Sequence, residues 1–151
     1  MSAPLPQAQA LQRRRLLALD PGERRTGVAV SDELGLFAHP RPAIHASDRA
    51  ALVEAVAVIV RDEQAGEVVV GLPLSLSGGD SAQTLAVRVL VAALRQRLDI
   101  PVSAWDERLS SVQAARSTRG AARRRSGELD SAAASLILQA VLDSRGSGTR
   151  S

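Results

Sequence analysis

The chain has 151 residues, with 19 basic residues, all of them arginine, against 16 acidic residues and a formal net charge of +3. It has no cysteine and two histidines. This excludes disulfides, iron–sulfur clusters and thiolate zinc sites, so a metal site would have to use the carboxylate oxygens that Mg²⁺, Mn²⁺ or Ca²⁺ prefer. Phe37 and Trp105 are the only aromatic side chains, which argues against proteins that stack several bases on aromatic platforms.

The length fits a single domain, which we place at residues 15–145, and we expect residues 1–14 and 146–151 to be disordered tails. The longest apolar stretch, at 50–60, is too short to span a bilayer. The N-terminal residues lack the order of a signal peptide. We therefore expect a cytoplasmic protein that does not interact with membranes.

The first half of the predicted domain has the pattern of three strands and a helix. Short apolar runs at 15–19, 26–31 and 35–44 are separated by turn residues, and connections this short are typical of an antiparallel meander. Ser47 or Asp48 can cap a helix that runs to about residue 64.

The second half alternates strands with helices. We expect strands at 67–70 and 100–105, a helix at 80–98 that opens on a capping box of Asp80 and Gln83, and a last helix at 130–143. This order predicts an α/β fold with one five-stranded mixed sheet, its first three strands antiparallel, flanked by helices. In such sheets functional sites gather at the carboxyl ends of strands.

Three acidic residues occupy positions where such a site would form. Asp20 ends the first strand, Glu107 follows the last strand and Asp130 opens the last helix, with Asp32 and Glu128 in reserve. Converging carboxylates repel one another unless a divalent cation neutralises them, and two such ions about 3.5–4 Å apart can activate water and stabilise a leaving oxygen. Simpler roles stay open: Asp20 could initiate a turn, Asp130 could cap a helix and Glu107 could pair with an arginine.

Arginines are concentrated in one segment that has no acidic residue. Residues 108–125 hold six of them, a local charge of +6 that predicts a phosphate-binding surface. They are Arg108, Arg116, Arg119, Arg123, Arg124 and Arg125. The alternative is a solvated face produced by an arginine-rich composition.

Four segments carry a resemblance to a known family. They are LALDPGERRTGVAVSD at 17–32, VVGLP at 69–73, DERLS at 106–110 and LDSAAASLILQAVL at 129–142. In this order they resemble the motifs of the YqgF/RuvX family of RNase H-like nucleases, whose members are described as pre-16S rRNA nucleases and as Holliday-junction-resolvase-like. Pro21 and Thr26 depart from the residues more common in the family, and both suit a turn and a strand.

The resemblance implies an RNase H-like fold whose catalytic and metal-binding residues are Asp20, Glu107 and Asp130. It places Arg25 in the first motif and Arg108 beside the catalytic glutamate, where we expect both to bind nucleic acid. The structural residues that it places near the site are Gly22, Gly27, Gly71 and Pro73.

The expected function is a divalent-metal-dependent nuclease that uses Mg²⁺ or Mn²⁺ to hydrolyse phosphodiester bonds of structured nucleic acid. The resemblance implies maturation of the 5′ end of pre-16S rRNA, with pre-ribosomal particles as partners of a monomer or homodimer. A Holliday-junction resolvase that cuts branched DNA as a symmetric dimer is the alternative within this class. A non-catalytic nucleic-acid-binding protein is the alternative from another class, and three acids facing phosphate argue against it. A sugar-kinase-like phosphotransferase would need a longer chain.

Overall fold

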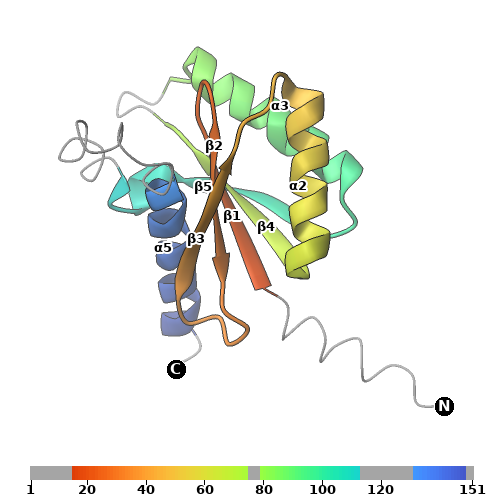
Figure 1. Ribbon diagram of the computed structural model, residues 1–151. Coiled ribbons are helices and arrows are strands. Elements are labelled where there is room, and N and C mark those ends of the chain that lie inside the picture. The colour runs from red at the N-terminus through yellow and green to blue at the C-terminus, as the bar shows by residue number, and fades with distance from the viewer. Residues whose placement is uncertain (1–14, 75–78, 113–130, 149–151) are drawn as a thin grey trace.

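The computed structural model describes residues 15–74, 79–112 and 131–148, and Figure 1 shows how their elements are arranged. The five strands form one sheet in the order β3-β2-β1-β4-β5, in which β1 pairs antiparallel with β2 and parallel with β4. The strands are β1 (Arg15–Pro21), β2 (Thr26–Ser31), β3 (Ala38–Ile44), β4 (Ala65–Leu72) and β5 (Val102–Asp106). The predicted mixed five-stranded sheet is confirmed.

Helices cover both faces of this sheet (Figure 1). They are α2 (Arg49–Glu63), α3 (Ala82–Arg97) and α5 (Ala132–Gly148), with a short 3₁₀ helix, η1 (Glu107–Leu109), after β5. No helix in the described ranges is long and apolar enough to cross a membrane.

The side chains of β1 divide the core into two layers. Leu17 and Leu19 pack on the side of α2 and α3, whereas Leu16 and Ala18 pack on the side of α5. Because successive side chains of a strand alternate between faces, a strand buried on both sides is apolar at nearly every position. The next residue in this alternation, Asp20, therefore belongs to the α5 face.

Two helix ends differ from the sequence expectation. The N-cap of α3 is Ser81, whose side chain accepts from the backbone N–H of Thr84, so the capping box that we placed at Asp80 is one residue too early. Asp80 instead accepts from Arg88, almost two turns into the helix. At the other end of the domain α5 continues to Gly148, past the helix end that we predicted at residue 143, and Arg145 pairs with Glu67 of β4 at 2.7 Å.

Candidate active site

Asp20 lies near the end of the central strand, between two glycines. On β2 its registered partner is Gly27, and on β4 the residue after the pair Leu19–Val70 is Gly71. Its side chain is 8% exposed. On both neighbouring strands the residue level with Asp20 is therefore a glycine, which has no side chain.

Glu107 reaches the same region from β5. It is the first residue of η1 and is 2% exposed. A Cβ built on Gly71 would lie 3.5 Å from Glu107 Cγ, 3.5 Å from Leu19 O and 2.6 Å from Ile137 Cδ1. A side chain at residue 71 would therefore have to displace the end of the Ile137 side chain of α5, and it would lie in van der Waals contact with Glu107. Asp20 and Glu107 lie on either side of this glycine.

The start of α5 is fixed to the same end of the sheet. Ser131 is fully buried, and its hydroxyl accepts from Val28 N at 3.0 Å and donates to Arg41 O at 2.6 Å. Val28 and Arg41 are registered partners on β2 and β3, next to an irregularity in the register at Gly27. The motif LDSAAAS contains this serine, and sequence reasoning missed its role as the bridge between strands and helix.

The third predicted acid, Asp130, lies outside the described residues, and so do Glu128 and five of the predicted phosphate-binding arginines, Arg116, Arg119 and Arg123–Arg125. Within the described ranges no group of three or more His, Cys, Asp or Glu side chains could hold a metal ion. The structure thus brings together Asp20 and Glu107 from the predicted set.

A tight turn follows Asp20. Gly22 N donates to Arg25 O at 2.9 Å, and a Cβ on Gly22 would lie 2.9 Å from the same oxygen. Gln83 of α3 donates to Pro21 O at 3.1 Å and so holds the turn against the helix. This geometry places the exposed Arg25 on the turn. Across the site, Pro73 O accepts a hydrogen bond from the Thr84 hydroxyl, which ties the segment after β4 to the first turn of α3.

Arg108 is bound to a carboxylate. Its guanidinium donates to both oxygens of Asp106, at 3.0 and 2.8 Å, and its backbone N–H donates to the same side chain at 2.9 Å. The Arg108 guanidinium holds the pKa of Asp106 below its usual value. Arg108 therefore takes part in an intramolecular pair, and a phosphate would compete with Asp106 for it.

Asp32, a reserve candidate for the metal, lies at the other end of the sheet. It follows β2, and its carboxylate accepts from the backbone N–H groups of Leu36 and Phe37. Hydrogen bonding to Leu36 lowers the pKa of this carboxyl. Asp32 thus closes the turn between β2 and β3. Because β2 runs antiparallel to β1, its last residue lies at the end of the sheet away from Asp20, and the reserve role of Asp32 in metal binding is wrong.

The antiparallel β1–β2–β3 meander, followed by parallel β4 and β5 with helices on both faces, defines an RNase H-like fold. The structure titled "T. thermophilus RuvC in complex with Holliday junction substrate" is similar to this chain with a TM-score of 0.58, covering 90% of this chain and 97% of that one at 18% identity. A second Thermus thermophilus RuvC structure gives 0.55, with coverages of 88% and 96% at 16% identity. Both likenesses show the fold.

Sequence comparison identifies the family. The family model described as "RuvX: Holliday junction resolvase" matches residues 14–144, and the chain belongs to this family. A protein of Maridesulfovibrio salexigens is 39% identical over 131 residues, which cover 85% of this chain and 97% of that protein. A protein of Koribacter versatilis is 41% identical over 135 residues, with coverages of 87% and 88%. Both are named "Putative pre-16S rRNA nuclease". The predicted family membership is confirmed.

Proposed function

We propose that this protein is a divalent-metal-dependent nuclease that hydrolyses phosphodiester bonds of structured nucleic acid, first of all at the 5′ end of pre-16S rRNA, in the cytoplasm. The observation that carries the proposal is that two buried acidic residues lie at the same edge of the sheet, Asp20 near the end of β1 and Glu107 directly after β5, with Gly71 of β4 between the two strands. Membership of the RuvX family and the names of the relatives support it.

The residues suit a hard divalent cation. Asp20 and Glu107 offer oxygen ligands, and burying two carboxylates together is costly unless a cation neutralises them. Asp130 directly precedes Ser131, whose hydroxyl is fixed to β2, and we propose it as the third ligand. When bound, Mg²⁺ or Mn²⁺ ions lower the pKa of water and stabilise the charge that develops on a departing oxygen.

The chain's own groups then have distinct tasks. Asp20 and Glu107 hold the cations at the carboxyl edge of the sheet, while the exposed Arg25 and the arginines of the segment 108–125 bind flanking phosphates. Phosphate contacts of this kind position a substrate and carry little sequence information. We therefore propose that the shape of the nucleic acid, more than its sequence, determines which substrate is cut.

The test is the conservative exchange Asp20→Asn. We expect it to abolish cleavage in Mg²⁺ and in Mn²⁺ while the fold and nucleic-acid affinity stay close to those of the wild type. Asp143→Asn is the matched control, because Asp143 is an exposed residue of α5 that accepts a hydrogen bond from Gln139 of the same helix. Cleavage that survives in Asp20→Asn would contradict the proposal.

A comparison of substrates distinguishes the proposed function from its two alternatives. Wild type and Asp20→Asn should be incubated with precursor rRNA, single strands and four-way DNA junctions, and the cuts mapped. Cuts in precursor rRNA that need Asp20 support the rRNA assignment, whereas symmetric cuts confined to the junction would replace it with a resolvase. Binding of all three without any cleavage would leave a non-catalytic nucleic-acid-binding protein.

A further inference from the structure

A pocket lies at the same end of the sheet as Asp20, but on the opposite face, which α2 and α3 cover. It encloses about 310 Å³ and is formed by the turn at 21–26, the segment at 44–52 and the first half of α3. Figure 1 shows these segments gathered at the end of the sheet where β1 finishes. Pro21 and Gly22 line the pocket and directly follow Asp20. The pocket and the carboxylate therefore share one turn.

The base of the pocket is apolar and well supported. Ile44, Val87 and Leu90 line it and belong to the core between the sheet and the two helices, with Leu52 packed against the same cluster. The hydrogen bond from Gln83 to Pro21 O closes one side. The flat face of a nucleobase can cover these apolar side chains, while its polar edge points away from them.

The rim carries three arginines, Arg24, Arg25 and Arg49, against Glu23 and Asp48. Asp48 is engaged as the N-cap of α2, where it accepts from Ala51 N at 2.8 Å. Most arginines in the described part of the chain are held by a carboxylate, and Arg95 is held by the carbonyl of Val102. In the same ranges Arg24 and Arg49 have neither an ion pair nor a side-chain hydrogen bond, and both lie at this rim.

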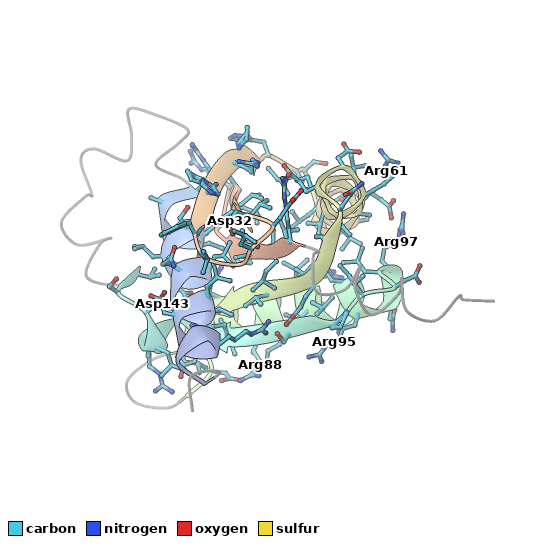
Figure 2. All side chains as sticks on the ribbon, turned by 90° about the horizontal axis from the view of Figure 1, so that it is seen from below. Asp32, Arg61, Arg88, Arg95, Arg97 and Asp143 are labelled. Atoms are coloured by element: carbon cyan, nitrogen blue, oxygen red, sulfur yellow. The ribbon has the colours of Figure 1, made fainter. Side chains whose placement is uncertain are left out.

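A second and larger cavity has arginines of a different kind. It encloses about 970 Å³ at the opposite end of β1 and is also lined by arginines, among them Arg15, Arg61 and Arg97. Each of these three is bound to a carboxylate, Arg15 to Glu63, Arg61 to Asp62 and Arg97 to Glu54. Arg61 and Arg97 lie on the same side of the molecule in Figure 2. In contrast, Arg24 and Arg49 of the smaller pocket have no such partner among the described residues and are available to an outside anion.

We propose that the smaller pocket binds one unpaired nucleotide of the substrate, near the phosphate that is cut and around the end of β1 from it. Its base lies on Ile44, Val87 and Leu90, and Arg24 and Arg49 hold its phosphate. The volume is near the lower end of the range for small-molecule pockets, about 300–1,000 Å³, so a single nucleotide fits and a duplex does not. The inference rests on the proposed nuclease function and adds to it a preference for a single-stranded segment beside the cleavage site.

The experiment uses binding, so that it does not depend on cleavage. The Asp20→Asn protein, without metal, is titrated into a fluorescein-labelled RNA hairpin with a single-stranded extension, and abasic nucleotides are placed along the extension one at a time. We expect one abasic position to weaken binding about fivefold, because the apolar contact with its base is lost. In Ala86→Trp, which fills the pocket from α3, the same position should have no effect. Ala92→Trp, exposed on the same helix and outside the pocket, is the matched control.

Arg24→Ala together with Arg49→Ala should weaken binding of the intact hairpin about tenfold, and Arg61→Ala should not. A flat abasic profile, or the same profile in Ala86→Trp and its control, would overturn the pocket assignment. Cleavage that does not need Asp20 would overturn the proposed function. It would leave this binding profile unchanged, so the two failures are distinguishable.

Discussion

The hydroxyl of Ser131 accepts a hydrogen bond from Val28 N at 3.0 Å, which joins the first turn of α5 to β2 across more than one hundred residues of chain. The same hydroxyl donates to Arg41 O on β3, so one side chain bridges two strands and a helix. Asp130, which we propose as the third metal ligand, directly precedes this serine in the sequence. We therefore expect Ser131 to matter for activity as well as for stability, although it binds no substrate.

Ser131→Ala should therefore destabilise the protein and lower its activity. The exchange leaves the buried N–H of Val28 and the carbonyl of Arg41 without this partner, at a cost of about 2 kcal/mol or more in the free energy of unfolding. Urea denaturation measures the loss. Ser144→Ala is the control, since Ser144 is exposed and donates to a carbonyl of its own helix. Equal stability of the two variants would show that the bridge contributes nothing.

Gly71→Ala should damage the site more than the fold. The new methyl group would meet Ile137 Cδ1 at 2.6 Å, and relief of that clash moves Ile137 or β4 at a cost of about 1–3 kcal/mol. Because the methyl group would lie in van der Waals contact with Glu107 Cγ, a shift of β4 that relieves the clash also moves the glutamate, and we expect cleavage to fall at least tenfold under conditions where the variant is fully folded. Gly79→Ala, where a built Cβ has no heavy atom within 4 Å, is the control. An active Gly71→Ala enzyme would mean that Glu107 does not need its present position.

Glu63 makes stability depend on pH at the end of the sheet opposite the site. The hydrogen bond from Arg41 at 2.8 Å, supported by Arg15 at 2.7 Å, lowers the pKa of Glu63 from its usual 4.5. Because the folded pKa is below the unfolded value, this stabilisation is fully present above pH 4.5 and is lost as the pH falls through the folded pKa.

Glu63→Gln should accordingly lower the free energy of unfolding by about 1 kcal/mol at neutral pH and by progressively less in acid. Denaturant titrations from neutral to acidic pH measure how the free energies of unfolding of wild type and Glu63→Gln converge. Glu54→Gln removes a carboxylate from the exposed pair with Arg97 and should change little at any pH. A difference in the free energy of unfolding that stays constant with pH would contradict the stabilising role of ionised Glu63.

The basic segment can be tested through salt dependence, although Arg123–Arg125 lie outside the described residues. If they bind phosphates, replacing all three with alanine should reduce the slope of log affinity against log salt concentration by roughly 2–3, because each contact releases about one counterion. The triple exchange of Arg61, Arg88 and Arg97, which are in exposed ion pairs, removes the same charge elsewhere. Equal slopes in the two variants would mean that these arginines form a solvated face and do not bind phosphates.

The sequence predicts the order and number of the strands well, because β1 and β4 are apolar at almost every position and turn residues separate the others. It also predicts that Asp20 and Glu107 end strands at the same edge. It does not reveal that Gly71 lies between them, since register depends on pairing across the sheet. Nor does it reveal that Arg108 folds back on Asp106, because the competition between a carboxylate and a phosphate is decided by local geometry. The unpaired state of Arg24 and Arg49 depends on which acids the fold places near them.

The sheet order has a consequence for the growing polypeptide. Asp20 is translated early, but Glu107 arrives only after β4 has been made and β5 has paired with it. A nascent chain that has emerged only as far as β4 carries the first carboxylate without the second, and such non-local pairing forms late in folding. An unfinished or prematurely released chain therefore lacks Glu107 and the strand that carries it, and we expect such a chain to be inactive.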